Sequence, residues 1–417
     1  MRALLAIALS LPVAALARDV PVATPSALVA AVNDALPGDR ILIEPGTYLV
    51  TQNLVCDTVA SAALPIEVRA RTARTVLIRF ANAGGVTEGF RPLAPYWRFE
   101  GLDIEGACTV DSDCEHAFHL AGDADFTVIR DNRIRDFNAQ IKSNTAAPGS
   151  GQFPDDVLIE RNELYDTRAR NTSNPVTKMD VVGGRRWVVR GNDIHDFQKG
   201  GGDTISYGAF LKGNARDGLM ERNLVRCARD FTGGVRIGLS LGGGGTSPGT
   251  ICEGGTCDPE HQGGVLRNNL VLACSDVGVY LNRAANTRIE HNTLYDTSGI
   301  DVRFTSSTAD VRNNLLSGAI RNRDGGTSTQ AGNLASVPLA TFATWFRAPA
   351  AADFALLEGS TIVDQGAAAP LVLDDYCGNL RDDGARDTGA LEYDVQPTCD
   401  TRFAGGFAAP LFADGFE

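Results

Sequence analysis

An asparagine recurs along the middle of the sequence, each time directly after a short apolar segment. The intervals between neighbours are 30, 30, 31, 46, 23 and 22 residues, and the positions are Asn132, Asn162, Asn192, Asn223, Asn269, Asn292 and Asn314. A period of about 20–30 residues that combines strands and turns is typical of a solenoid. Because stacked amide side chains can hydrogen-bond from coil to coil, we predict an asparagine ladder inside the solenoid.

A second pattern follows the asparagine units. When Gly208, Gly234, Gly278 and Gly299 are taken as a common origin, the first and third residues after each glycine are apolar, and the second and fourth are mostly large or polar. Alternation with period two indicates strands with one buried face. The residues that we expect to be buried are Val235, Ile237, Val279, Leu281, Ile300 and Val302, and those that we expect to be exposed are Arg236, Tyr280 and Arg303.

These patterns resemble the right-handed parallel β-helix fold of polysaccharide lyases and related secreted proteins. An amphipathic segment, Ser26 to Asp34, precedes the strand-like Arg40 to Glu44, and a helix there would shield the open end of the stack. The resemblance implies an all-β, single-stranded right-handed parallel β-helix with an N-terminal capping helix. The expected division is a signal peptide (1–17), the β-helix with its cap (18–334), a C-terminal capping segment (335–395) and a tail (396–417).

The N-terminus predicts export. Arg2 precedes the apolar stretch Ala3–Leu16, and Ala15-Leu16-Ala17 resembles a signal-peptidase site. The stretch is too short to span a bilayer, and no later segment is long and apolar enough, so we expect a soluble periplasmic or extracellular protein. The tail Leu411–Glu417 resembles a C-terminal signature of exported proteins in some Gram-negative bacteria.

Because an exported protein enters an oxidising compartment, we expect most of the nine cysteines to form disulfides. The expected pairs are Cys108 with Cys114, Cys252 with Cys257, Cys377 with Cys399 and Cys227 with Cys274, which leaves Cys56 unpaired. Metal binding by Cys252 and Cys257 is the alternative for that pair, but no second cysteine or histidine pair has zinc-site spacing.

The net charge of the chain limits the classes of molecule that it can bind. The chain carries 38 Lys and Arg against 51 Asp and Glu, a formal net charge of −13. This balance argues against nucleic acid, which needs a basic face. An acidic polysaccharide is compatible only if basic residues form a local strip; the candidates are Lys212, Arg236, Arg283 and Arg303. We expect a monomer.

The segment from Lys212 to Gly238 resembles the chondroitinase B and alginate lyase family. The match holds at Lys212, at the Asn223 turn, at Arg236 and at Gly238. Ile237 stands where that family has histidine, and the paired glutamates that hold calcium in that family are absent. Either a different Ca²⁺ site exists, with Asp180 and Asp203 as candidate ligands, or there is no calcium.

The resemblance implies β-elimination on a uronate-containing glycan. Lys212 would be the general base, and Arg236 would neutralise the uronate carboxylate from the neighbouring coil. The expected substrate-binding residues are Lys178, Asn214, His261, Tyr280, Asn282, Arg283 and Arg303. The insertion Leu239–Gln262 is expected to wall the groove, and His116 and His119 to point into the same face.

Three alternatives remain open. Lys142, Asp180 and Lys212 could form a ladder of alternating charges on successive coils, without catalysis. The whole protein could be a non-catalytic carbohydrate-binding or cell-surface β-helix. A uronan C5-epimerase is a variant of the lyase hypothesis, because it shares the abstraction of the C5 proton.

Overall fold

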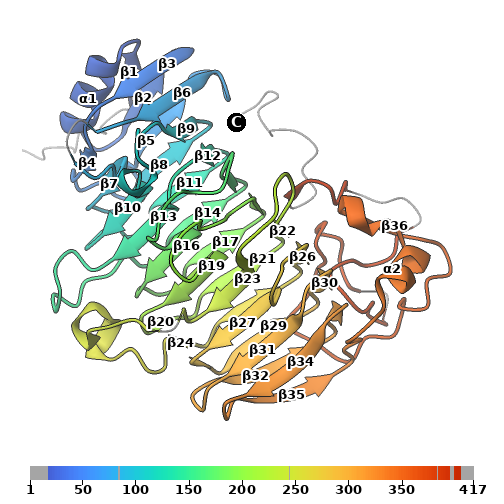
Figure 1. Cartoon of the computed structure of the whole chain (residues 1–417). Helices are drawn as coiled ribbons and strands as arrows, with labels where there is room; N and C mark the ends of the chain where they lie inside the picture. The colour runs from blue at the N-terminus through green and yellow to red at the C-terminus, as the bar shows by residue number, and fades with distance from the viewer. Residues whose placement is uncertain (1–16, 83–84, 244, 383, 395–398, 405–417) are drawn as a thin grey trace, which may run out of the picture.

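The computed structural model describes residues 17–82, 85–243, 245–382, 384–394 and 399–404. The predicted signal peptide, apart from Ala17, and the C-terminal signature lie outside these residues. The described chain winds into a right-handed solenoid of three long parallel sheets, which confirms the predicted fold (Figure 1). Successive strands enter sheet A, sheet B and sheet C in turn, and each strand pairs with its equivalent on the next coil.

Sheet A consists of β1 (Arg18–Val22), β2 (Asp39–Ile43), β5 (Ile66–Ala70), β8 (Trp97–Glu100), β11 (Val128–Arg130), β14 (Leu158–Glu160), β17 (Val188–Arg190), β21 (Leu219–Glu221), β25 (Val265–Arg267), β29 (Thr287–Glu290), β32 (Thr308–Arg312) and β35 (Thr327–Ala331). Sheet B consists of β3 (Gly46–Val50), β6 (Val76–Phe80), β9 (Asp103–Gly106), β12 (Arg133–Arg135), β15 (Glu163–Tyr165), β18 (Asp193–His195), β22 (Leu224–Arg226), β26 (Leu270–Leu272), β30 (Thr293–Tyr295) and β33 (Leu315–Leu316).

Sheet C consists of β4 (Leu54–Cys56), β7 (Phe90–Pro92), β10 (His116–Ala121), β13 (Ala139–Asn144), β16 (Val176–Val182), β19 (Ile205–Lys212), β23 (Val235–Leu241), β27 (Val279–Asn282), β31 (Gly299–Arg303) and β34 (Ala319–Arg323). The smaller elements are β20 (Ala215–Arg216), β24 (His261–Gln262), β28 (Ala284–Ala285), β36 (Phe346–Ala348), β37 (Asp353–Leu356), α1 (Pro25–Asn33), α2 (Leu339–Trp345), and the 3-10 turns η1 (Asp111–Asp113), η2 (Gly249–Ile251), η3 (Glu253–Gly255) and η4 (Pro349–Ala351).

The asparagine ladder forms at the turn between sheets A and B. Each amide nitrogen donates to the amide oxygen of the next asparagine, as from Asn162 to Asn192 at 3.0 Å and from Asn192 to Asn223 at 3.0 Å. The ladder continues past the predicted members to Asn333. The left-handed conformation falls on the residue before each asparagine, for example Arg161 at φ 53°. The asparagines therefore satisfy buried backbone groups rather than supply the turn itself.

The predicted register of sheet C is wrong at one strand. Gly208 lies beside Gly238, not Gly234, because Tyr207 pairs with Ile237 and Ala209 with Leu239. Gly234 precedes β23 with a φ of 65°. Val279, Leu281, Ile300 and Val302 are buried in the core as predicted. The four-residue slip moves Val235 and Ile237 away from that core: Val235 is half-buried, and Ile237 belongs to a separate outer cluster with Tyr280.

The two ends of the chain use different packing. Helix α1 lies against the first coils, with Leu28 and Val32 buried in the solenoid core and the Thr24 hydroxyl capping its N-terminus. The segment that follows β35 packs along the flank of the last coils, as Figure 1 shows in orange and red. Its aromatic residues Phe342 and Tyr376 share an apolar cluster with Leu270 of sheet B.

The predicted disulfides are confirmed. The pairs are Cys108–Cys114, Cys227–Cys274, Cys252–Cys257 and Cys377–Cys399, and Cys56 is free and buried. The disulfide occupies the sulfur atoms of Cys252 and Cys257, which rules out the alternative metal site there. Over the described ranges, none of the helices has the length and apolarity needed to cross a membrane.

Candidate functional site

Three charged side chains follow one another across the outer face of sheet C. Lys142 Nζ donates to Asp180 Oδ2 at 2.8 Å, and Lys212 Nζ lies 3.5 Å from Asp180 Oδ1. Lys142 and Asp180 are register partners on β13 and β16, and Lys212 ends β19. The predicted arrangement of alternating charges is confirmed, and the role of Lys212 in catalysis stays a prediction. We call Lys142, Asp180 and Lys212 the charge ladder.

The charge ladder is mostly shielded from solvent. The Lys142 and Lys212 side chains are 16% and 17% exposed, and Asp180 is 9% exposed. Burial alone would raise the pKa of Asp180, but the ammonium groups of Lys142 and Lys212 outweigh it and hold that pKa below its ordinary value. The Lys212 ammonium also lies over the Phe210 ring, 4.3 Å from its centroid. The carboxylate is therefore ionised at neutral pH, and the ladder carries a net positive charge.

Histidines adjoin the charge ladder on β10. His119 Nδ1 lies 2.7 Å from Glu88 Oε1, and His119 Nε2 lies 3.1 Å from Asn144 Oδ1. The His116 and His119 rings meet edge to face, with centroids 5.2 Å apart. His119 is the register partner of Lys142. Both histidines thus face the outer surface of sheet C, as predicted.

The insertion borders the charge ladder at the end of β19. It leaves β23 at Gly242 and returns at β24, in the yellow loop beside β20 and β24 in Figure 1. A side chain at Gly243 would come within 2.7 Å of Lys212 Cδ, so the loop backbone closes over that lysine. Glu253 anchors the loop through Arg185 and the Gly184 amide. The predicted wall therefore exists beside Lys212.

Arg236 does not lie beside Lys212, which overturns the predicted catalytic pair. Arg236 pairs with Ser206 at the start of β19, whereas Lys212 ends that strand. Six residues of strand, about 20 Å, separate the two positions. The Arg236 guanidinium is buried and donates to Gln198 Oε1 and to the carbonyl oxygens of Cys227, Phe231 and Gly233. It ties down the loop before β23 rather than facing a substrate.

Three predicted substrate-binding residues are buried in structural roles. Lys178 is fully enclosed within the solenoid and donates to Asp166 at 2.7 Å. His261 is also fully buried, beside Gly218 and Gly264, and its ring nitrogens have no hydrogen-bond partner among the described residues. Asn214 is 1% exposed and anchors the insertion by donating to the Glu253 carbonyl. These predictions are wrong, because none of the three side chains reaches the outer face.

The remaining predicted contacts lie further along sheet C. Tyr280 and Asn282 are 7% and 6% exposed, which contradicts the prediction that Tyr280 is exposed. Tyr280 packs against Ile237 and accepts a hydrogen bond from Arg303. Arg283 and Arg303 are partly exposed and both stack on Phe304. Arg283 follows the second strand beyond that of Lys212, and Arg303 ends the third.

The structure does not support Ca²⁺ bound between Asp180 and Asp203. Asp180 is held by two ammonium groups, and Asp203 pairs with Lys199 in the loop before β19. Ca²⁺ requires six to eight oxygen ligands. No group of candidate metal ligands among the described residues includes either aspartate. The donor set does not fit the ion, so the predicted site is wrong.

Two polar residues of this face escaped the sequence analysis. Glu88 lies 31 residues before His119, and Asn144 lies 25 residues after it. Neither belongs to a local motif. The signal that could have found Asn144 is its position at the end of β13, on the same face as Lys142. Glu88 precedes β7 and had no comparable signal.

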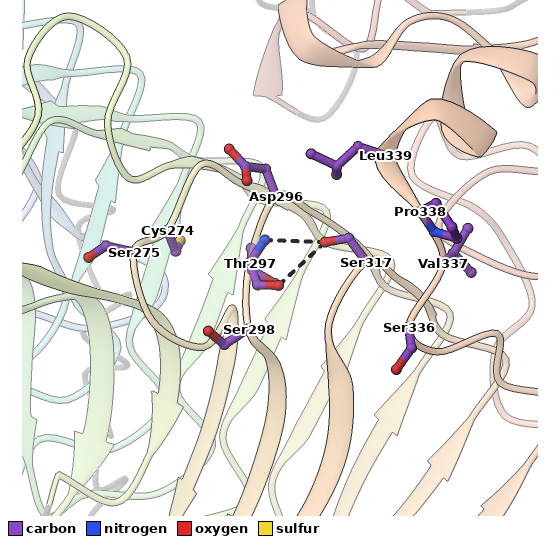
Figure 2. A pocket seen from close by; sticks show the side chains of 10 residues that line it. All are labelled: Cys274, Ser275, Asp296, Thr297, Ser298, Ser317, Ser336, Val337, Pro338 and Leu339. Atoms are coloured by element: carbon purple, nitrogen blue, oxygen red, sulfur yellow. Dashed lines mark hydrogen bonds between the residues drawn. The ribbon is translucent and has the colours of Figure 1, made fainter.

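A hollow lies away from these charges, between the turns after sheet B and the C-terminal segment (Figure 2). Half of its lining residues carry hydroxyl groups, and Ser317 Oγ lies 3.2 Å from the Thr297 amide nitrogen. Asp296 is the charged residue among its lining side chains, and no cation lines it. An acidic ligand would find no partner charge there, so the outer face of sheet C is the better candidate site.

Comparisons with known proteins agree with this architecture. The chain is similar to the solved structure of pectate lyase Pel9A, with a TM-score of 0.62 and 14% identity over 91% of this chain and 97% of that one. It is also similar to a rhamnogalacturonan lyase, with a TM-score of 0.51 and 14% identity over 79% and 92% of the two chains. XylC in complex with xylose gives a TM-score of 0.52 and 11% identity over 76% and 75%.

At these identities the likeness shows the fold. A search of the curated proteins finds no match to the sequence. The family model described as the right handed beta helix region matches residues 107–333. Since this match spans more than half of the sequence, the chain belongs to the right-handed β-helix family.

Proposed function

We propose that this protein is an exported lyase that cleaves a uronate-containing polysaccharide by β-elimination on the outer face of sheet C. The observation that carries the proposal is the charge ladder, in which two of the four lysines of the chain meet one carboxylate. An acidic glycan needs cations on a surface that is otherwise negative, and this strip supplies them. The pectate lyase and rhamnogalacturonan lyase among the similar structures support the same reaction class.

In this proposal Lys142 pairs with the carboxylate of the bound uronate. Removal of the C5 proton creates negative charge on that carboxylate, and a fixed ammonium group stabilises the charge as it develops. Lys212 is the base: its ammonium group first loses a proton to water, and the resulting amine takes the C5 proton. The C5 electron pair then forms the C4–C5 double bond and expels the C4 oxygen, which takes a proton from water.

The second candidate is a non-catalytic carbohydrate-binding protein. Its support is that the Lys212 ammonium group already has two partners, the Asp180 carboxylate and the Phe210 ring. A lysine held in this way can bind an acidic sugar without transferring a proton. An epimerase would use the same C5 abstraction but would return a proton without cleavage.

The deciding experiment measures the ultraviolet absorbance of unsaturated uronate on pectate, rhamnogalacturonan, alginate and glycosaminoglycans. We expect a rise on at least one substrate, and a loss of about 10²-fold or more in kcat for Lys212→Ala. Lys212→Arg should not restore turnover, because arginine keeps its proton. Lys199→Arg is the matched control, since Lys199 also pairs with an aspartate but lies before the start of β19.

The other possible outcomes distinguish between the candidate functions. Full turnover by Lys212→Arg removes Lys212 as the base. Binding of a glycan with no absorbance rise and no change in uronate composition selects the non-catalytic candidate. A changed composition without absorbance selects the epimerase.

The proposed location is the periplasm or the cell exterior. The four disulfides support it, because such bonds persist in oxidising compartments. Cell fractionation of the native host tests it: a product that begins at Arg18 in the periplasm or medium is expected, and an unprocessed cytoplasmic chain would contradict it.

A further inference from the structure

Glu88, His116 and His119 gather at one point of the outer face of sheet C. Each offers one ligand atom, and these atoms lie within 4.8 Å of one another. Strand β10 places both histidines there because Ala117 and Phe118, between them, both turn into the solenoid core. Glu88 reaches the same point from the residues before β7. We call these three residues the His–Glu cluster.

The tautomer of His116 leaves a lone pair directed at this cluster. Its Nδ1 lies 3.3 Å from the Ala139 carbonyl oxygen, which can only accept, so Nδ1 carries the proton. Its Nε2 has no hydrogen-bond partner among the described residues, although the residue is only 9% exposed. A neutral imidazole held through its other nitrogen is the form that binds metals.

His119 and Glu88 complete the donor set. Asn144 Oδ1 accepts from His119 Nε2, which leaves Nδ1 directed at Glu88. In the metal-free protein a proton occupies the 2.7 Å gap between Nδ1 and Glu88 Oε1. A bound metal ion would take the place of this proton between His119 Nδ1 and Glu88 Oε1.

Other charged groups surround the cluster on every side. Arg91 lies 3.1 Å from Glu88, and Lys142 is the register partner of His119. Glu115 lies 3.8 Å from His116 Nε2, and Asp180 faces Lys142. Asp180 also pairs with Lys212, so charges of both signs border the cluster in equal number.

We propose that the His–Glu cluster is a binding site for a divalent transition-metal ion of the zinc class. Two imidazole nitrogens and one carboxylate suit zinc and its neighbours, whereas Ca²⁺ prefers oxygen ligands alone. Three protein ligands leave a fourth position open for water or for a glycan oxygen. The proposal goes beyond the lyase function and does not depend on it, since metal binding is measurable without turnover.

The test uses the full-length mature protein without a histidine tag, stripped with chelator and titrated with Zn²⁺ by calorimetry. We expect one equivalent to bind. Ca²⁺ in excess should not compete.

Variants locate the site. His116→Ala and Glu88→Gln should each weaken Zn²⁺ binding by ~10-fold or more, as loss of even outer-shell partners does. The matched control is His195→Gln. His195 lies in a similar cluster with Glu163 and Asp193, but its two ring nitrogens are already engaged by Asp196 and Glu163. Circular dichroism establishes that each variant is folded.

Cobalt provides a readout on the wild-type protein alone. Co²⁺ at the proposed site should give the intense visible absorption of a four- or five-coordinate ion, and Zn²⁺ should remove it. A spectrum like that of hexa-aqua cobalt overturns the proposal. So does Zn²⁺ affinity that is unchanged in Glu88→Gln and His116→Ala, or equal competition by Ca²⁺.

Discussion

The asparagine ladder and the charge ladder both run from coil to coil, one inside the solenoid and the other outside it. Asn162, Asn192 and Asn223 occupy equivalent positions on successive coils. In the charge ladder Lys142 and Asp180 are register partners, and Lys212 reaches Asp180 from two residues further along β19. An amide both donates and accepts, so each asparagine can bond to a copy of itself and the ladder runs to Asn333. Charges must alternate in sign, so a basic residue must be followed by an acidic one, and no member of the charge ladder can pair with a copy of itself.

Because of this difference, the asparagines stabilise the fold, whereas the lysines of the charge ladder can bind a ligand. The asparagine side chains form their hydrogen bonds within the protein, and they are buried over most of the ladder. The lysines at the ends of the charge ladder retain ammonium hydrogens that a ligand can use. We therefore expect changes in the first ladder to affect stability most, and changes in the second to affect both stability and binding.

The largest effect should come from breaking the asparagine ladder at its centre. Asn192→Ala removes the bonds to Asn223 Oδ1 and the Ile159 carbonyl, and leaves the Asn162 amide groups without their acceptor. Each buried unsatisfied group costs about 1–3 kcal/mol, so we expect a loss of about 3–6 kcal/mol in urea unfolding.

Asn333→Ala is the control at the end of the ladder. Asn333 is half-buried and is the last member of the ladder, so its loss should cost about 1–2 kcal/mol. Equal losses for Asn192→Ala and Asn333→Ala would show that the ladder does not stabilise the fold through its buried amides.

The ladder and the fold could be predicted from the sequence because they rest on repetition. A residue type that recurs at the same point of each coil is visible in a single chain. The register of β23 could not be predicted in the same way. Gly234 and Gly238 lie four residues apart, and a slip by an even number preserves alternation, so the pattern fits both registers equally.

The candidate site was predicted only in part. Lys212 and its link to Lys142 and Asp180 followed from charge and repeat position. Lys178 and His261 failed because their side chains turn into the solenoid, where a basic residue is unexpected. Lys178 is tolerated there because Asp166 is equally buried beside it. Such a pairing depends on three-dimensional packing and leaves no local pattern in the sequence.

Removing the central carboxylate of the charge ladder should have the next largest effect. Asp180→Asn leaves two ammonium groups facing each other, and breaking a mostly buried ion pair costs about 3 kcal/mol. The pKa of Asp180 is lowered in the folded state, so its contribution is present above the unfolded pKa and is lost as pH falls through the folded value. The difference between wild type and variant should therefore shrink below about pH 4.

Asp203→Asn is the matched control, because Asp203 also pairs with a lysine but its side chain is 61% exposed. An exposed pair contributes about 0–1 kcal/mol, so this variant should unfold close to wild type. If Asp180→Asn and Asp203→Asn lowered the free energy of unfolding equally, the charge ladder would not stabilise the fold.

The smallest effect concerns His261, a buried polar group that belongs to neither ladder. Burial lowers its pKa to about 3 from an ordinary value of 6.5. Between these values the unfolded chain binds a proton at this position and the folded chain does not, so stability falls as pH drops from about 6.5 towards 3. His261→Leu removes this penalty, and its stability should decline less between pH 7 and pH 5, by about 2 kcal/mol.

His195 provides a control of opposite sign for this last prediction. Although burial lowers its pKa, hydrogen bonds to Asp196 and Glu163 outweigh that effect and raise the pKa above its ordinary value. Its contribution is therefore full below the unfolded pKa and is lost as pH rises through the folded value. His195→Leu should accordingly lose more stability at pH 5 than at pH 8. His261→Leu and His195→Leu should therefore change the pH dependence of the free energy of unfolding in opposite directions. A change in the same direction would show that this dependence is not set by whether a buried histidine has hydrogen-bond partners.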